Sequence, residues 1–413
     1  MSEWKEETLG ELSIRVSSGL TPLKSNKKFW ENPSIPWLKT DQLGEKYIFD
    51  TNTKISKEAL EQTSLRIYPE NTISIAMYGE GKTRGNISII KAPMTTNQAC
   101  CNIEIDPKLA DVEYVYYYLK TQYDSLRKLS SGVRKNLNSN DIKNYKIYMP
   151  ESVSVQKSII RILTSLDNKI NLNNQINQEL EAMAKTLYDY WFVQFDFPDQ
   201  NGKPYKSSGG KMVYHPELKR EIPEGWGVDS LWNIANFYNG LAMQKYRPDT
   251  NEDDYLPVIK IREMMNGFTK DTEKARLDIP TEAVVERGDI LFSWSATLEV
   301  IIWGKERGAL NQHIFKVTSE TYPKSFIYFE LKSYLKVFKA IAELRKTTMG
   351  HITQDHLKQA KIVVPPIELI SKLDAKLQPI MSQQQILENQ NQELTQLRDW
   401  LLPMLMNGQV KVE

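Results

Sequence analysis

Asn177-Gln178-Glu179-Leu180 and Asn391-Gln392-Glu393-Leu394 are the sharpest of several identities that repeat along this chain of 413 residues. Each lies within a long segment of helical character. The second copy begins about 220 residues after the first, a period far too long for a solenoid repeat. We therefore expect a duplicated unit, in which each copy consists of one domain followed by one long helix.

Weaker correspondences run through the whole of both copies and support the duplication. They are, in chain order, Trp4 with Trp226, Ser18-Gly19 with Asn239-Gly240, Pro36-Trp37-Leu38-Lys39 with Pro257-Val258-Ile259-Lys260, Thr96-Asn97-Gln98-Ala99 with Leu310-Asn311-Gln312-His313, and Asp141-Ile142-Lys143 with His356-Leu357-Lys358. Because the pairs keep their order, two similar domains with similar roles are expected.

Composition indicates a two-domain chain whose net charge is too small to produce a strong electrostatic field. The length allows two cores of the usual domain size. The 53 basic and 52 acidic side chains nearly cancel, so DNA binding would have to come from local patches or from a partner. Cys100 and Cys101 are adjacent, a spacing poorly suited to a disulfide, which favours a reducing, cytoplasmic setting. We expect no signal peptide, no membrane span and no metal site, since the four histidines are mostly far apart in sequence.

The pattern along the chain predicts an α+β fold, with two mixed domains and two long helices. Residues 1–150 show short extended stretches, such as 71–76 and 86–90, with a helix around 112–129. The expected segments are a first domain over 1–150, a first long helix over 151–196, a linker over 197–221 rich in Pro, Gly and Lys, a second domain over 222–365, and a second long helix with a tail over 366–413.

Seven-residue spacing of apolar residues predicts that the long helices form a coiled coil. The spaced residues are Leu166, Asn173, Leu180 and Leu187, with Ile170, Ile176 and Met183 between them, and Leu373, Ile380, Leu387, Leu394 and Leu401, joined by Leu377 and Leu397. A helix of about 40 residues is about 60 Å long, too long to be buried in one domain. The two helices are therefore expected to pair, antiparallel if a pseudo-two-fold axis relates the halves. The alternative is that each helix packs only on its own domain.

Two short motifs imitate enzyme signatures without the surroundings that the chemistry needs. Residues 76–83 resemble a phosphate-binding loop, but the β-branched residues after Arg84 predict the return strand of a hairpin instead of a helix. Asp199 and the later Glu217-Leu218-Lys219 imitate a nuclease site, but they lie in the expected linker. We expect no catalytic centre in this chain, and we interpret the hairpin tip as a DNA-contacting loop.

Taken together, the long helices and their ends resemble the specificity subunits of type I restriction-modification systems. The resemblance rests on the Asn-Gln-Glu-Leu helices, Tyr190-Trp191-Phe192-Val193-Gln194-Phe195-Asp196-Phe197, Ile222-Pro223-Glu224-Gly225-Trp226, and the tail Leu401-Leu402-Pro403-Met404-Leu405-Met406-Asn407-Gly408. These features span nearly the whole chain.

The resemblance implies two target-recognition domains that each read one half of a bipartite DNA sequence. It also implies that two conserved helices form an antiparallel coiled coil, set the distance between the half-sites and dock two methyltransferase subunits. The partner would bind S-adenosylmethionine and methylate adenine, and motor-nuclease subunits would cleave unmodified DNA. No cofactor is expected in this chain. Family members vary most in the recognition domains, so the resemblance does not specify the target sequence.

Candidate DNA-binding residues are the Lys and Arg side chains of expected loops, which suit phosphates and guanine, and the Asn and Gln side chains, which suit adenine. In the first domain they are Lys24, Lys27, Lys28, Lys39, Thr40, Lys82, Arg84, Asn97, Gln98, Arg134 and Lys135. In the second they are Gln244, Lys245, Tyr246, Arg247, Lys260, Arg262, Gln312, His313, Arg345 and Lys346. For each of them, a solvated surface charge or a turn residue satisfied within the fold is the alternative.

Two other functions stay open from the sequence. An autonomous DNA-modifying enzyme would methylate or cut DNA without partners. A coiled-coil scaffold without DNA specificity would carry its basic hairpin tips incidentally.

Overall fold

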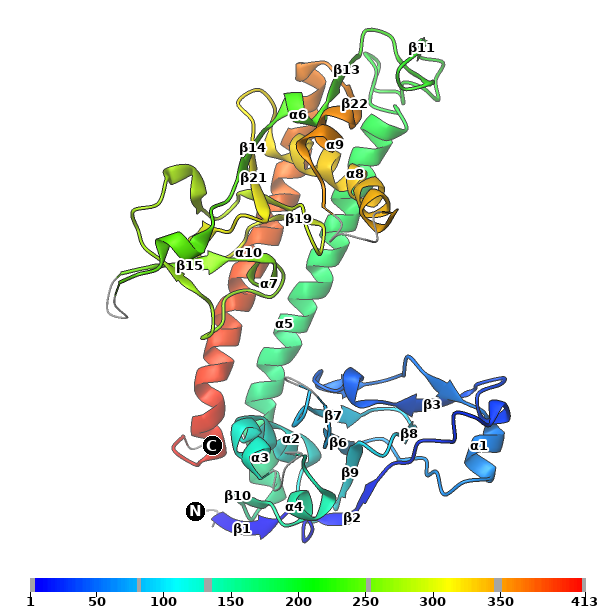
Figure 1. Ribbon diagram of the computed structural model, residues 1–413, viewed down its shortest axis with the longest axis vertical. Helices are drawn as coiled ribbons and strands as arrows, with labels where there is room; N and C mark the ends of the chain where they lie inside the picture. Colours follow the sequence, from blue (N-terminus) through cyan, green and yellow to red (C-terminus); the bar gives the residue numbers. More distant parts are fainter. Residues whose placement is uncertain (1–3, 80–82, 130–135, 250–253, 345–350, 411–413) are drawn as a thin grey trace. The chain divides into compact units, whose positions relative to one another are not determined.

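The computed structural model describes residues 4–79, 83–129, 136–249, 254–344 and 351–410. The helices are α1 Lys57–Glu61, α2 Val112–Thr121, α3 Tyr123–Lys128, α4 Ser139–Lys143, α5 Val153–Tyr188, α6 Leu231–Ile234, α7 Ile261–Asn266, α8 Lys324–Leu344, α9 Gln354–Gln359 and α10 Ile367–Met406 (Figure 1). Within these ranges, none of the helices is both long and apolar enough to cross a membrane.

The strands are short and fall into two sets, one in each half of the chain. The first set is β1 Trp4–Thr8, β2 Ser13–Ser18, β3 Ile35–Leu38, β4 Tyr47–Ile48, β5 Lys54–Ile55, β6 Thr72–Ala76, β7 Ile87–Ile90, β8 Thr95–Thr96, β9 Cys100–Ile105 and β10 Lys146–Pro150. The second set is β11 Met212–His215, β12 Arg220–Pro223, β13 Gly227–Ser230, β14 Asn236–Asn239, β15 Leu256–Ile259, β16 Lys274–Ala275, β17 Val284–Val285, β18 Ile290–Ser293, β19 Glu299–Ile302, β20 Gly308–Leu310, β21 Ile314–Thr318 and β22 Lys361–Val364.

The chain divides into two compact units, which we describe separately. In the first unit, residues 1–169 with 394–413, the main sheet has the order β2-β9-β6-β7-β4, and a smaller sheet has the order β5-β3-β8. The expected hairpin is present, because β6 and β7 pair antiparallel with Ile75 opposite Ile87. The expected helix over 112–129 is interrupted at Gln122 and forms α2 and α3.

In the second unit, residues 170–393, the same arrangement recurs. Its main sheet has the order β14-β21-β18-β19, and its smaller sheet has the order β16-β15-β20-β17. The parallel pairing of β3 with β8 in the first unit matches that of β15 with β20 in the second. The pairing of β1 with β10 likewise matches that of β13 with β22. The duplication read from the sequence is therefore a duplication of strand topology.

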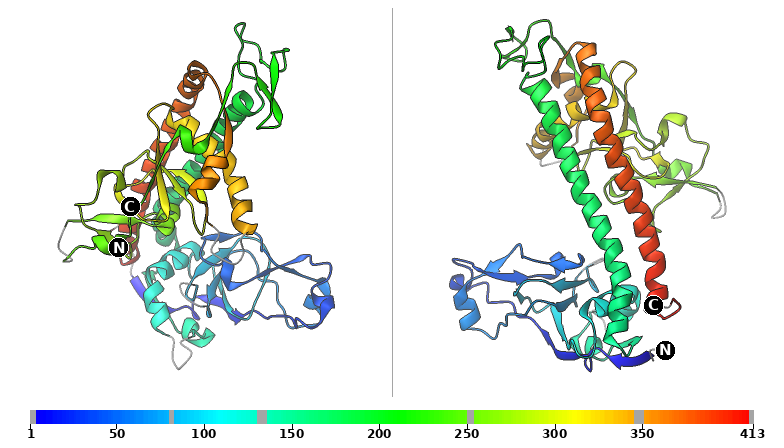
Figure 2. Two further views of the ribbon diagram at one scale, coloured as in Figure 1. Left: turned by 45° about the horizontal axis from the view of Figure 1, so that its top comes forward. Right: turned by 180° about the vertical axis from the view of Figure 1, so that it is seen from behind.

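Helices α5 and α10 pack antiparallel, as the heptad spacing predicts (Figures 1 and 2). Leu387 is buried in this seam, but Asn173 is buried there too, and its Nδ2 donates to the Oδ1 of Asn391 at 2.9 Å. Ile176, Met183 and Leu397 are 36%, 59% and 43% exposed, so the expectation that they extend the seam is wrong. At this level of α5 the contact with α10 is made by Asn177, four residues after Asn173, whose Nδ2 donates to the Gln384 carbonyl at 3.4 Å.

The helices also join the cores of the domains, so pairing and domain packing are not exclusive alternatives. Tyr188 of α5 and Leu373 of α10 belong to the large core of the second unit. In the first unit, Leu163 and Leu405 belong to the core that α2 covers. Because both helices contribute side chains to each core, the helix pair is a structural part of both units.

A partly buried polar network fixes α2 to the helix pair in the first unit. Lys46 Nζ lies 3.1 Å from Glu113 Oε2, and Tyr117 donates to Asp167 of α5. Arg398 of α10 completes the network with an ion pair of 3.0 Å to Asp167. Burial alone would raise the pKa of Glu113, but the hydrogen bond from Tyr47 and the charge of Lys46 outweigh it, and the pKa is lowered.

The segment over 197–221 has ordered structure of its own. Strands β11 and β12 form an antiparallel hairpin, with Val213 opposite Ile222. The Phe197 ring stacks on Tyr205 at 4.6 Å and on Trp226 at 5.0 Å between ring centroids. This aromatic stack ties the end of α5 to the beginning of the second domain.

Candidate nucleic-acid interface

Three segments of the first unit converge next to the Asn97-Gln98 turn. The amide of Gly19, just after β2, donates to the Cys100 carbonyl at 3.2 Å. The amide of Asn97 donates to the Leu38 carbonyl, at the end of β3, at 2.9 Å. The turn is therefore fixed by backbone hydrogen bonds on two sides.

The second unit has the same two backbone hydrogen bonds at the matching residues. Gly240 donates to the Ile314 carbonyl at 3.1 Å, and Asn311 donates to the Ile259 carbonyl at 3.1 Å. These are the residues that the sequence alignment pairs with Gly19, Cys100, Asn97 and Leu38. We call this location the convergence point of each domain: residues 18–21, 38–40 and 96–100 in the first, and 239–242, 259–261 and 310–314 in the second.

Both convergence points require glycine because the backbones approach closely. A Cβ on Gly19 would lie 2.2 Å from the Thr96 carbonyl oxygen, and a Cβ on Gly240 would lie 2.3 Å from the Asn311 carbonyl oxygen. No real Cβ contact is that short, so the turn would have to move. The matched Ser18-Gly19 and Asn239-Gly240 pairs in the sequence thus mark a geometric requirement.

Of the candidate readers at the first convergence point, Asn97 serves mainly the fold. Its Oδ1 accepts from the Ala99 amide at 3.2 Å, which closes the turn. Gln98 is exposed, and its Oε1 accepts from the Thr21 hydroxyl. The Gln98 amide nitrogen therefore lies at the surface with its orientation set by Thr21.

The cationic candidates of the first domain lie in loops, and several have acidic neighbours. Lys24, Lys27 and Lys28 are exposed, and Lys28 is 3.9 Å from Glu58. Lys39 pairs with Asp41 at 3.6 Å, and Thr40 begins a short 3-10 turn. The remaining candidates are Arg84, which is half-buried beside the hairpin, and Lys82, Arg134 and Lys135, which lie outside the described residues.

In the second domain the candidates form two groups. Gln244, Lys245 and Arg247 are exposed on and just after a short turn over Met243–Tyr246, with Tyr246 half-buried. Lys260 pairs with Glu273, and Arg262 with Glu263, each at 2.5 Å. Gln312 and His313 lie at the convergence point, while Arg345 and Lys346 lie outside the described residues.

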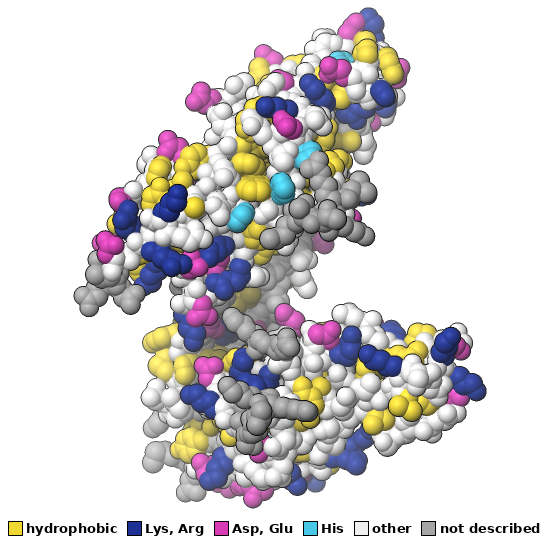
Figure 3. Space-filling view, viewed as in Figure 1, with side chains coloured by type: hydrophobic (Ala, Val, Ile, Leu, Met, Phe, Trp, Pro, Cys, Tyr) yellow, Lys and Arg dark blue, Asp and Glu magenta, His cyan; other side chains and the backbone are white. Residues whose placement is uncertain are grey.

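The acidic partners moderate the field of these cations. The hydrogen bond from Lys260 lowers the pKa of Glu273, so that pair is ionised at neutral pH. Figure 3 shows Lys and Arg side chains interspersed with acidic ones, as expected for a chain with a net charge of +1. Phosphate binding here would exchange ion pairs within the protein for ion pairs with DNA.

Three residues around the second convergence point were not predicted from the sequence: Asn239, Trp294 and His351. The Trp294 indole donates to Asn239 Oδ1 at 2.9 Å, and its ring lies 5.4 Å from His313 and 6.2 Å from His351 between centroids. Asn239 was visible in the sequence as the polar residue before a matched glycine. The role of Trp294 was not, because its contacts come from three distant segments.

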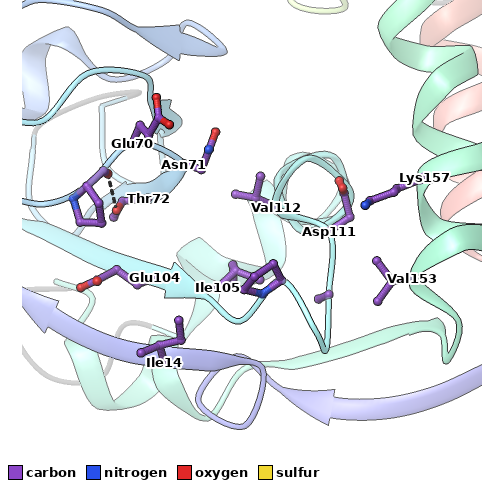
Figure 4. Close-up of a pocket in the computed structure, with 13 residues that line it drawn as sticks. Ile14, Glu70, Asn71, Thr72, Glu104, Ile105, Asp111, Val112, Val153 and Lys157 are labelled. Carbon is purple, nitrogen blue, oxygen red and sulfur yellow. Dashed lines mark hydrogen bonds between the residues drawn. The ribbon is translucent and has the colours of Figure 1, made fainter.

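A cleft of about 320 Å³ in the first unit lies at the start of α2 beside α5 (Figure 4). Its charged side chains are Glu70, Glu104, Asp111 and Lys157. Asp111 caps α2 by accepting from the Glu113 and Tyr114 amides, and Glu104 pairs with Arg66 at 2.7 Å. With acidic groups in excess, the cleft is unsuited to phosphate, and its carboxylates stabilise the fold.

Across the residues that the structure describes, no group of three or more His, Cys, Asp or Glu side chains could hold a metal ion. Cys100 and Cys101 are buried free thiols, and burial raises the pKa of each to about 12. They pack in the sheet as small apolar residues.

Comparisons with known proteins identify the family. The model for the type I restriction modification DNA specificity domain matches residues 1–182 and 223–396. The specificity subunit of the type I restriction enzyme MjaIX of Methanocaldococcus jannaschii is 28% identical over all of this chain and 94% of that protein. The specificity subunit of the HindI enzyme of Haemophilus influenzae is 22% identical over 99% of this chain and 100% of that protein.

A solved structure shares the fold. The S subunit of a type I restriction-modification system from M. genitalium matches with a TM-score of 0.56 over 98% of this chain and 96% of that chain, at 15% identity. The family model covers both copies of the duplication and most of the chain. The protein therefore belongs to the DNA specificity subunits of type I restriction-modification systems, and it is a non-catalytic component of such a complex.

Proposed function

We propose that each domain reads one half of a bipartite, asymmetric double-stranded DNA target, the first domain over 1–150 and the second over 222–365. One observation carries the proposal: the two convergence points share their backbone hydrogen bonds but differ in side chains. Gln98 in the first has an identical counterpart in Gln312, but Ala99 corresponds to His313 and Ser18 to Asn239. The same backbone structure with different side chains suits two domains that recognise different half-sites.

The two long helices would space the half-sites and dock two methyltransferase subunits. Apolar side chains exposed on their outer sides support docking, since solvent-facing helices otherwise carry polar residues. These side chains are Ile162, Leu172, Ile176 and Met183 on α5, and Ile386, Leu397 and Trp400 on α10. S-adenosylmethionine would be held by the docked subunits, and motor-nuclease subunits would join the same assembly. The complex would act in the cytoplasm, where the buried thiols stay reduced.

The reading proposal is tested by substitutions that affect one half-site at a time. In the complex reconstituted with the methyltransferase subunits, Arg84→Ala or Lys82→Ala should reduce methylation through the first half-site, and Gln312→Ala through the second. Loss of one good base contact corresponds to about a 5- to 150-fold change. Equal loss for targets altered in either half-site, or no loss in any variant, would refute the assignment.

The docking proposal is tested by making the outer side of the helices polar. Met183→Ser and Trp400→Ser, at side chains 59% and 63% exposed, should each weaken methyltransferase binding about tenfold or more. Leu277→Ser, at a side chain 53% exposed but away from both helices, is the matched control. Binding by sedimentation that is equal in all three variants would contradict docking on the helices.

These experiments also separate the rival functions. A coiled-coil scaffold would assemble with partners but show no half-site dependence. An autonomous enzyme would modify DNA without the methyltransferase.

A further inference from the structure

We infer that Asn239 contacts a hydrogen-bond acceptor on a base edge of the second half-site, guanine N7 or O6 or thymine O4, and that Trp294 positions it. The inference rests on the proposed function, and it names the chemistry by which the second domain would read DNA. Asn239 is exposed at the end of β14, directly before the glycine of the convergence point.

The indole of Trp294 fixes the orientation of the Asn239 amide. Its Nε1–H donates to Asn239 Oδ1 at 2.9 Å. A donor-only group such as the indole N–H can bond only to the oxygen of the amide, which turns the Nδ2 group away from the indole. Within the described part of the chain, no hydrogen bond uses the Nδ2 donors.

This orientation decides which bases suit the residue. An unconstrained asparagine presents a donor and an acceptor together and pairs bidentately with adenine N6 and N7. At Asn239 the indole engages one of the two lone pairs of the amide oxygen and fixes its direction, whereas both Nδ2 hydrogens stay available, so the residue presents chiefly its donors. Guanine N7 and O6 and thymine O4 are major-groove acceptors that match a donor. Adenine N7 is an acceptor too, but it lies beside the N6 amino group, a donor that a second amide donor cannot pair with.

Trp294 is itself held in place, so the orientation is present before DNA binds. Its amide donates to the His313 carbonyl at 3.3 Å, and its carbonyl accepts from the Ile352 amide at 2.8 Å. Its ring contacts Phe315 and His351, with centroids at 6.0 and 6.2 Å. Such preorganisation lowers the entropy lost on binding.

At the matching position of the first domain, no indole among the described residues orients a side-chain amide. Ser18 occupies the position of Asn239, and its hydroxyl hydrogen-bonds to the Ser139 hydroxyl at 2.7 Å. Met77 occupies the position of Trp294, since its amide donates to the Ala99 carbonyl as that of Trp294 donates to His313. An amide oriented by an indole therefore occurs at the second convergence point and not at the matching position of the first.

The test is genome-wide mapping of adenine methylation by the reconstituted complex with single variants. Asn239→Asp keeps the shape but replaces the donor by a carboxylate, and should reduce methylation of the native motif about 5- to 150-fold, with the first half-site unchanged. Trp294→Phe keeps a ring but releases the Asn239 oxygen, and should admit adenine at one position of the second half-site. Asn236→Asp, exposed on the same strand, is the matched control.

Unchanged motifs in both Asn239→Asp and Trp294→Phe would overturn the inference while leaving the proposed function intact. Absence of any bipartite motif with the unaltered chain would instead refute the proposed function. If Asn239→Asp lowers the melting temperature, Asn239→Ser decides: loss of discrimination at one base pair supports the contact, and an unchanged motif overturns it.

Discussion

Replacement of Glu330 by glutamine should change how the stability of the second unit depends on pH. Glu330 of α8 accepts a hydrogen bond of 2.5 Å from the buried Tyr188 hydroxyl. Burial raises the pKa of Glu330 to about 7, from an ordinary value of 4.5, because the hydrogen bond from Tyr188 and the charge of Arg220 only partly offset desolvation. Between these two pH values the folded state holds a proton that the unfolded state has lost.

The sign and size of the effect follow from that proton. Since the folded pKa is the higher one, this group's contribution is fully present below pH 4.5 and is lost as pH rises through about 7. The slope is about −1.4 kcal/mol per pH unit, and the total loss is about 3 kcal/mol. Glu330→Gln stays neutral and keeps an acceptor for Tyr188, so it should be more stable than the unaltered chain by about 3 kcal/mol at pH 8.

Chemical denaturation of the full chain at several pH values between 4.5 and 8 measures this difference. Subtracting the unaltered chain from the variant cancels all other titrating groups. Glu343→Gln, at an exposed residue on the same helix, is the matched control and should not reproduce the gain of about 3 kcal/mol at pH 8. A difference for Glu330→Gln that is constant with pH, or that grows toward low pH, would refute the reasoning.

Three further predictions concern the convergence point and the helix pair. Gly240→Ala should displace the turn whose carbonyl lies 2.3 Å from the new Cβ and abolish discrimination at the second half-site only, whereas Gly227→Ala, with 3.9 Å available, should be silent in methylation mapping. A double-mutant cycle of Asn173→Ala and Asn391→Ala should give a coupling of at least about 0.5 kcal/mol in denaturation, and additive losses would contradict the seam contact. Arg398→Ala should destabilise the first unit by about 1.5–3 kcal/mol, and an unchanged unfolding midpoint would exclude a stabilising ion pair.

The duplication and the helix pair could be predicted from sequence because both depend on periodic signals. The matched Asn-Gln-Glu-Leu segments showed the repeat distance of the duplication, and the heptad spacing predicted that α5 packs against α10. The sequence could not show whether Ile176 and Met183 lie in the seam. A mean spacing of 3.5 residues allows the next seam residue to follow after either three or four positions, and only the structure shows which.

The sequence alone could align the two convergence points, but it could not show which of their side chains are engaged within the fold. Alignment of Asn97 with Asn311 placed the convergence points, and backbone hydrogen bonds repeat there. Whether a side chain is available depends on tertiary neighbours: Asn97 closes its own turn, and Arg262 pairs with the buried Glu263. The orientation of Asn239 by Trp294 joins residues 55 positions apart, which no local pattern encodes.

The most direct test of a sequence-reading subunit is adenine methylation mapped genome-wide in cells that express the cognate methyltransferase subunits with and without this chain. The account predicts one bipartite asymmetric motif, methylated only when the chain is present, whose two halves respond separately to substitutions in the first and second domains. Methylation that is the same with and without the chain, with an assembled and active methyltransferase, would contradict it.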